Sequence, residues 1–267
     1  MRKIIAPILV MLFISCQDNE LKTDVTPETN AIEALNEYAL INQIFQDVGN
    51  NSGDAVLSAE SSATGKISQS KNGPIITVEP FDFVTFPKTT TVDFGDGTLC
   101  EDGITRKGII TIVSTKWYGQ EGSLHTSTFS NYYHGKFKVE GTHVVENLGK
   151  NEDDFLEFSV SINNGKVTAE DGESVSFSEE SFRTWIAGSN TPLNIWDDEY
   201  LLEGVQSGTS SKGVDYTLTI EEALHFVLLP RSIESGILDM EIGDVSDIKV
   251  NYTFGTITIL GKTYSWN

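Results

Sequence analysis

Apolar and polar residues alternate along most of this chain, from about residue 74 to the C-terminus. In the clearest run, one parity is apolar and the other polar: Val214, Tyr216, Leu218 and Ile220 against Asp215, Thr217, Thr219 and Glu221. Further apolar faces of the same period are Ile110 and Ile112; Phe137, Val139, His143 and Val145; Leu156, Phe158, Val160 and Ile162; Leu238, Met240 and Ile242; and Ile248, Val250, Tyr252 and Phe254. Because successive side chains of a strand point to opposite faces, this period indicates antiparallel strands with one buried face.

Turn residues separate several of these runs. Asn163-Asn164-Gly165 and Asp171-Gly172 supply residues that tolerate positive φ, as tight hairpins require, and Leu260-Gly261-Lys262 is expected to turn the last hairpin. The sequence therefore predicts a mainly β fold over 74–267, a long antiparallel meander forming a sandwich-like or barrel-like body. A faint echo between Phe137–Gly141 and Tyr200–Gly204 leaves open two related units, 74–162 and 163–267.

One amphipathic helix is expected before the strands, over residues 27–49. Thr26 can cap it, Pro27 suits its first position, and Gly49 is a plausible stop. Its apolar residues recur every three or four positions at Leu35, Tyr38, Ile41, Phe45 and Val48. Residues 50–73 are rich in Ser, Gly, Asn and Ala and predict a linker or mobile loop.

The N-terminus has the order of a bacterial export signal. Arg2 and Lys3 precede an apolar run from Ile4 to Ile14, and Ser15 precedes Cys16. The run is shorter than the roughly 20 residues that span a bilayer as a helix. The segment Phe13-Ile14-Ser15-Cys16 resembles the bacterial lipobox, which implies a signal peptide over 1–15 and lipidation of Cys16. A plain secretory signal cut nearby is the alternative.

An acidic stretch follows the expected lipidation site. Gln17, Asp18, Asn19 and Glu20 resemble the surface-export signal of Bacteroidota lipoproteins, which implies display on the outer membrane. The alternative is that residues 16–26 form only a solvated acidic tether and the protein faces the periplasm.

The charge balance restricts the partners of the chain. A formal net charge of −21 repels phosphate backbones, so nucleic acid is excluded as a partner. The expected partners are the membrane, through the lipid on Cys16, and an envelope protein or glycan. With Cys16 lipidated, Cys100 has no partner for an internal disulfide.

No catalytic motif and no cofactor site are predicted from the residues. His125, His134 and His143 could approach a metal if they lay on neighbouring strands, but His143 shares the parity of an apolar face and is expected to pack there. An acidic, glycine-containing loop offers weak candidates for calcium ligands: Asp93, Asp96, Glu101 and Asp102. Its spacing does not match an EF-hand.

Aromatic residues near expected strand ends are the best indication of binding. Exposed aromatic rings bind sugar faces and protein partners, although core packing is the alternative for most of them. The candidates are Trp117, Tyr118, Tyr132, Tyr133, Trp185 and Trp196.

The order of segments resembles a group of uncharacterised Bacteroidota surface lipoproteins with a lipobox, an amphipathic helix and two β-rich halves. The segments that carry the resemblance are Tyr38–Gly49, Val92–Gly97, Gly108–Ile112, Thr128–Tyr133, Val139–Thr142, Asp198–Gly208 and Gly261–Tyr264. The resemblance implies no catalytic residues. We expect a non-catalytic binding or interaction module at the cell surface. The alternative is a surface hydrolase of glycans or peptides, since the pairing of catalytic carboxylates is spatial and a sequence does not show it.

Replacing Cys16 with Ala tests the anchor. Each buried acyl methylene contributes about 0.8 kcal/mol to membrane binding, so Cys16→Ala should abolish palmitate labelling and release the chain from washed membranes. Cys100→Ala, which leaves the anchor in place, is the control. A Cys16→Ala chain that stays with the membrane after a high-salt wash would contradict the prediction.

Overall fold

The computed structural model describes residues 27–61, 66–68, 73–188, 191, 197–228 and 231–266. The predicted signal peptide, Cys16, the stretch from Gln17 to Glu20, and Trp196 lie outside these residues. Within the described part of the chain, no helix is both long and apolar enough to cross a membrane.

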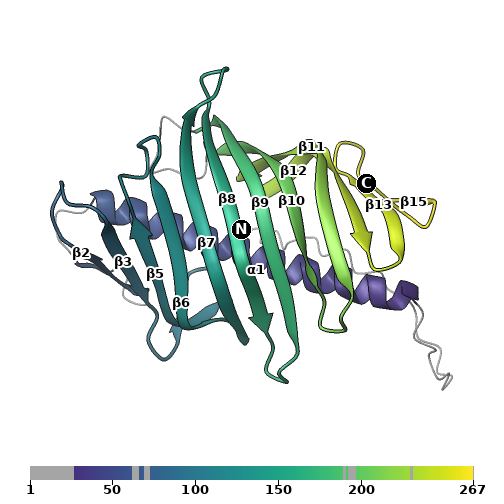
Figure 1. Ribbon diagram of the computed structural model, residues 1–267, viewed down its shortest axis with the longest axis horizontal. Helices are drawn as coiled ribbons and strands as arrows, with labels where there is room; N and C mark the ends of the chain where they lie inside the picture. Colours follow the sequence, from purple (N-terminus) through teal and green to yellow (C-terminus); the bar gives the residue numbers. More distant parts are fainter. Residues whose placement is uncertain are drawn as a thin grey trace, which may run out of the picture.

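The predicted antiparallel meander is confirmed, and it forms one open sheet (Figure 1). Fourteen strands follow one another in chain order, from β1 to β15, and the short β4 pairs with β5 beside this path. The strands are β1 (Lys66–Ser68), β2 (Ile75–Glu79), β3 (Lys88–Asp93), β4 (Thr98–Leu99), β5 (Thr105–Ser114), β6 (Leu124–His134), β7 (Phe137–Lys150), β8 (Leu156–Thr168), β9 (Ser174–Ala187), β10 (Glu199–Thr209), β11 (Asp215–Leu228), β12 (Arg231–Ile242), β13 (Val245–Asn251), β14 (Thr256–Ile259) and β15 (Lys262–Ser265).

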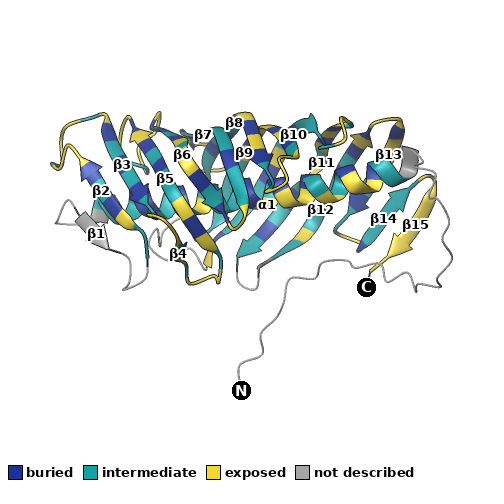
Figure 2. Cartoon of the chain, turned by 90° about the horizontal axis from the view of Figure 1, so that it is seen from below, coloured by how far each residue is buried: buried dark blue, intermediate teal, exposed yellow. Residues whose placement is uncertain are grey.

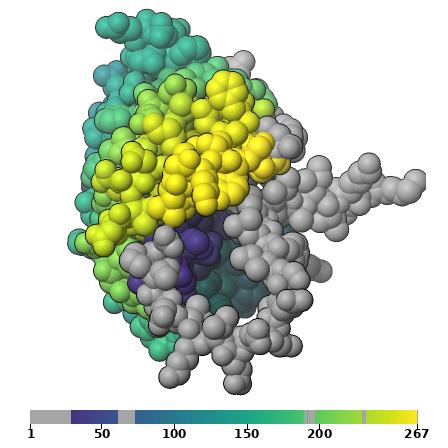
Figure 3. Space-filling model, turned by 90° about the vertical axis from the view of Figure 1, so that its right-hand side faces the viewer, coloured from purple at the N-terminus to yellow at the C-terminus, as the bar shows by residue number. Residues whose placement is uncertain are grey.

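A single long helix, α1 (Pro27–Ser61), crosses the strands on one side of the sheet (Figures 1 and 2). It begins at Pro27 as predicted. At about 1.5 Å per residue it is roughly 50 Å long, and it packs against strands from both ends of the sheet: β2, β3, β5, β9, β12 and β13. Seen from the end where α1 begins, the C-terminal strands lie above the helix (Figure 3).

The predicted helix end at Gly49 is wrong, because α1 continues to Ser61. The predicted loop over 50–73 is accordingly wrong for its first twelve residues and for β1. Val48, Ala55 and Val56 are buried against the sheet. This burial outweighs the cost of about 1 kcal/mol that a glycine brings to a helix interior.

Two of the three predicted turns are confirmed. Gly172, with positive φ, closes the loop between β8 and β9, and Leu260 and Gly261, also with positive φ, turn β14 into β15. The hairpin predicted at Asn163-Asn164-Gly165 is wrong: these residues form a bulge inside β8. A Cβ at Gly165 would lie 2.5 Å from the Phe177 carbonyl oxygen and 3.0 Å from Phe45 Cζ, so glycine is required by close packing. The possible unit boundary at 162/163 also falls inside β8.

The main core lies between α1 and the sheet. Phe45 on the helix stacks on Phe177 of β9 with ring centroids 5.4 Å apart, and Tyr38 meets Tyr216 of β11 edge-on at 5.6 Å. The Tyr38 hydroxyl donates a hydrogen bond of 2.6 Å to Gln206 Oε1 on β10. The faces predicted at Phe158–Ile162 and Tyr216–Leu218 are buried at alternate positions, as the period requires.

Truncation of Leu218 tests this core. The side chain is 1% exposed, and a buried Leu→Ala change typically costs about 2–5 kcal/mol because it removes apolar contacts and leaves a cavity. We expect Leu218→Ala to lower the free energy of unfolding by that amount in a denaturant titration. Thr219→Ala, at an exposed position of the same strand, should change it by less than about 0.5 kcal/mol. Equal effects of the two changes would show that the assigned face is wrong.

Candidate functional site

A cavity of about 240 Å³ lies between the C-terminal half of α1 and strands β7 to β10. In this measure one water molecule needs only about 10–15 Å³, so the space suits a small organic molecule. Most of its walls are apolar or aromatic, which is typical of ligand pockets. The lining residues come from α1 and from the four strands, with Tyr118, Asp198 and Leu228.

The floor of the cavity is built by a repeated pattern in four neighbouring stretches of chain. Each contributes two residues that are two positions apart and therefore share a face of the sheet. Residues of these stretches are also cross-strand neighbours: Val145 pairs with Val160, Phe158 with Arg183, and Trp185 with Tyr200. The pairs are His143 and Val145, Phe158 and Val160, Arg183 and Trp185, and Asp198 and Tyr200.

The roof of the cavity is formed by Gly49, the predicted helix end, and by residues of α1 between 50 and 57, which were predicted to lie in a loop. Gly49 and Gly53 stand one helical turn apart and both line the cavity, with Asp54 and Leu57. A Cβ at Gly49 would come within 3.1 Å of His143 Nε2, whereas a Cβ at Gly53 would meet only Tyr118 Oη, at 3.9 Å. Gly49 therefore allows the helix to pack closely on His143, and Gly53 leaves space between the helix and the sheet.

His143 is a buried polar group on the cavity floor. Its residue is 2% exposed, and its Nδ1 has no hydrogen-bond partner among the described residues. Burial and the nearby charge of Arg183 lower the pKa of His143 to about 3. The imidazole is therefore neutral near pH 7. It does pack on an apolar face, as its parity predicted, but it also faces a cavity.

Arg183 is the only cation among the residues that line the cavity. Among the described residues no carboxylate lies within 4.0 Å of it, and its buried Nε has no hydrogen-bond partner. The guanidinium carbon lies 5.5 Å from the ring centroid of Tyr200, close enough for a cation–π contact.

Two acids also line the cavity. Burial raises the pKa of Asp198 to about 6, although hydrogen bonding from Trp185 opposes the shift. Burial also raises the pKa of Asp54. The cavity thus combines an unpaired guanidinium, a neutral imidazole and two carboxyl groups whose charge is costly.

The predicted aromatic residues do not form one surface. Tyr118 and Trp185 line the cavity. Trp117 lies against Phe86, with ring centroids 5.1 Å apart, and the Tyr133 ring lies 3.9 Å from Lys107 Nζ. The prediction that Tyr132 is available for binding is wrong, because it is 0% exposed: adjacent tyrosines on a strand point to opposite faces.

The predicted metal candidates are also dispersed. Asp93 accepts a hydrogen bond from the Gly95 amide, Asp102 accepts one from the Ile104 amide and pairs with Arg106, and Asp96 and Glu101 are exposed. In the described part of the chain, no group of three or more His, Cys, Asp or Glu residues is placed to hold a metal ion. The three histidines have separate neighbours: His125 contacts Ser114, His134 contacts Asp47, and His143 faces the cavity.

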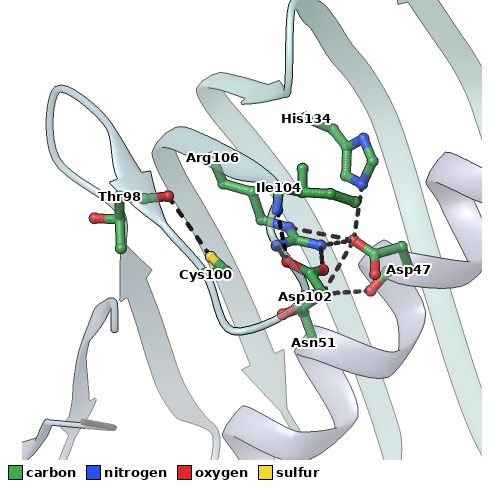
Figure 4. Close-up of polar contacts among 8 residues, drawn as sticks. All are labelled: Asp47, Asn51, Thr98, Cys100, Asp102, Ile104, Arg106 and His134. Carbon is green, nitrogen blue, oxygen red and sulfur yellow. Dashed lines mark hydrogen bonds and ion pairs between the residues drawn. The ribbon is translucent and has the colours of Figure 1, made fainter. Parts of the chain in front are cut away.

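A charged cluster fixes α1 to the sheet just before the cavity begins (Figure 4). Arg106 of β5, with a side chain only 1% exposed, binds Asp47 of α1 and Asp102, both at 2.5 Å. His134 Nε2 lies 3.1 Å from the same Asp47 oxygen. Gly49 is two residues after Asp47. The cluster therefore helps to fix the distance between α1 and the sheet where the cavity begins.

Sequence reasoning missed most of the cavity. The sequence alone does not identify Arg183, Phe158, Tyr200 or Gly53 as site residues. The available signals were the i, i+2 pairs on adjacent strands and the two glycines four positions apart. These patterns indicate a cavity only when the strand register and the course of the helix are known.

No protein-family model, no curated protein and no solved structure matches this chain.

Replacing Asp47 with Asn tests the cluster. Burial raises the pKa of Asp47, but hydrogen bonds from His134 and Arg106 outweigh it, so the net shift is below the ordinary value of 3.8. The ionised carboxylate therefore stabilises the fold above that value, and this stabilisation is lost as the pH falls through the lower folded pKa. Since hydrogen bonds to charged groups contribute about 1.5–3 kcal/mol, Asp47→Asn should destabilise the fold by about that amount at pH 7.

The pH dependence provides the check. Denaturant titrations of both proteins should give a difference that persists down to about pH 4 and shrinks at lower pH. Asp153→Asn, on an exposed loop, is the control. A constant difference down to pH 2 would show that ionised Asp47 does not carry the effect.

Proposed function

We propose that this chain is a lipid-anchored envelope lipoprotein whose folded body binds a small, largely apolar molecule in the cavity under α1. The observation that supports this proposal is the cavity itself, which has a volume of about 240 Å³ and lies between Gly49–Leu57 and four strands. In this proposal the body is a non-catalytic binding module.

Gly53 in the cavity roof supports binding over a purely structural role. Glycine in a helix interior is less stable than alanine by about 0.5–1 kcal/mol. At Gly53 the structure has room for a Cβ, whose nearest neighbour would be 3.9 Å away. A residue that lowers the stability of the helix and leaves space beneath it is typical of binding sites, where function is often gained at a cost in stability.

The location in the cell is part of the same proposal. The apolar run before Cys16 and the acidic stretch from Gln17 to Glu20 support an outer-membrane lipoprotein displayed at the surface. The resemblance to the Bacteroidota surface lipoproteins supports the same location. The tether leads directly to the N-terminus of α1, so the helix that roofs the cavity is also the element nearest the anchor in the chain.

A hydrolase is the second candidate, and one observation favours it. Asp54 and Asp198 both line the cavity, and burial raises the pKa of both, as general acids require. The apolar walls formed by Leu57, Val145 and Val160 favour retention of an apolar ligand over hydrolysis of a polar polymer.

Filling the cavity from its roof tests the proposed function. A leucine at position 53 would extend from a site with room for its Cβ into the space that a ligand needs. We expect Gly53→Leu to abolish the fluorescence enhancement of N-phenylnaphthylamine, a neutral apolar probe, on the chain from residue 17 onward. Gly53→Ala should keep the enhancement and raise the free energy of unfolding by about 0.5–1 kcal/mol.

The outcomes separate the two candidates. A wild-type chain that leaves the probe fluorescence unchanged, or a Gly53→Leu chain that enhances it fully, contradicts binding in this cavity. Release of sugars or peptides from envelope material that stops in both Asp54→Asn and Asp198→Asn would favour the hydrolase instead.

A further inference from the structure

Among the described basic residues that are not exposed, Arg183 is the only one without a carboxylate oxygen within 4.0 Å. The cations Lys88, Arg106, Lys138, Lys150, Lys212 and Lys249 each have a carboxylate oxygen within 4.0 Å. Arg183 has none among the described residues, in a chain with 39 acidic and 18 basic residues. A guanidinium that is partly removed from water and has no carboxylate in contact with it can gain a direct ion pair from a bound anion.

The free edge of Arg183 suits a particular kind of anion. Nε is buried and lacks a hydrogen-bond partner among the described residues. The Nε and Nη donors on one edge of a guanidinium match the two oxygens of a carboxylate, and such bidentate pairs are among the strongest charge-assisted hydrogen bonds.

His143 provides a second donor on the same floor. Its Nδ1 is buried and has no partner among the described residues, and it belongs to a residue that is 2% exposed. Both residues line the cavity, from β7 and β9 on either side of β8, and the Arg183 charge helps to lower the pKa of His143. With the proton on Nδ1, the neutral ring can donate one hydrogen bond to a bound oxygen.

The rest of the lining describes the body of the ligand. Beyond the charged groups, His143, the two glycines and the polar Asn50, the walls are Leu57, Val145, Phe158, Val160 and Leu228, with the rings of Tyr118, Trp185 and Tyr200. A polymer of hydroxyl groups would leave many hydrogen bonds unmade against these side chains, whereas an alkyl or aryl body would be buried favourably.

Asp54 and Asp198 disfavour the binding of an anion, so variants of these residues should change its affinity in the direction opposite to variants of Arg183. Both are acids in the lining. Removing the charge of either should strengthen the binding of an anion, whereas removing the charge of Arg183 should weaken it. A neutral ligand would respond little to either change.

We infer that the cavity binds small amphipathic monocarboxylates, with the carboxylate on Arg183 and His143 and the apolar body against β7 and β8. This inference rests on the proposed function and goes beyond it by naming the ligand class. It assigns Arg183 as the residue that determines specificity for the head group.

Isothermal titration calorimetry with matched probes tests the inference. Decanoate, decanamide and decylamine share an alkyl body and differ in head-group charge. On the chain from residue 17 onward, decanoate should bind about 10–100-fold more tightly than decanamide, since hydrogen bonds to charged groups have that strength. Decylamine should bind more weakly than both.

Variants assign the effect to Arg183. In Arg183→Met the preference for decanoate over decanamide should disappear, and in Asp198→Asn decanoate should bind more tightly than in wild type. Lys212→Met, which removes an exposed surface cation, is the control and should keep the wild-type preference. Decanamide also serves as the folding check, because Arg183→Met should still bind it.

The possible failures are distinguishable. Equal binding of decanoate and decanamide by wild type overturns the carboxylate inference and leaves the apolar cavity of the proposed function intact. If none of the three probes binds, and N-phenylnaphthylamine is also unaffected, the proposed function fails. Tighter binding of decyl phosphate than of decanoate would overturn the assignment to carboxylates.

Discussion

The fold depends on how one helix covers one face of a long sheet. Fourteen strands joined in chain order make a sheet with a buried parity and an exposed parity, and the buried parity needs a partner layer. In the described residues α1 is the only helix longer than one turn, so its 35 residues supply that layer. Where its side chains are large, as at Phe45, a core forms. Where a side chain is absent, as at Gly53, a cavity remains between the two layers.

Two arginines of the sheet, Arg106 and Arg183, show how the same side chain can stabilise a fold or prepare a site. Arg106 binds two carboxylates and connects β5 to α1. Arg183 lines the cavity beneath the same helix but has no carboxylate within 4.0 Å among the described residues. In a chain of net charge −21, acidic partners are abundant. A guanidinium without one is therefore the feature that most clearly separates the cavity from the rest of the core.

The sequence was sufficient for the class of fold and insufficient for the site. Period-two alternation is a local property, so strands such as Tyr216–Leu218 and the turn at Gly172 could be predicted from neighbouring residues alone. Asn163-Asn164-Gly165 was misread because a bulge and a hairpin need the same positive-φ residues, and only the packing of Gly165 against Phe45 distinguishes them. Gly49 was misread because a helix stop and a helix facing a cavity both use glycine. The grouping of Arg183 with His143 depends on strand register, which a single sequence does not show.

The meander also determines the order in which the molecule can assemble. Each strand pairs with its neighbour in the chain apart from the crossing over the short β4, so most of the sheet closes through contacts of short sequence separation. Such local pairings cost little loop entropy and form early. The contacts of α1 are different: Tyr38 meets Gln206, 168 residues away. The helix leaves the ribosome before every strand that it must cover, and it can dock fully only after the last of them has joined the sheet. Its docking is therefore expected to be the late step of folding, and the cavity beneath it the last part of the molecule to exist.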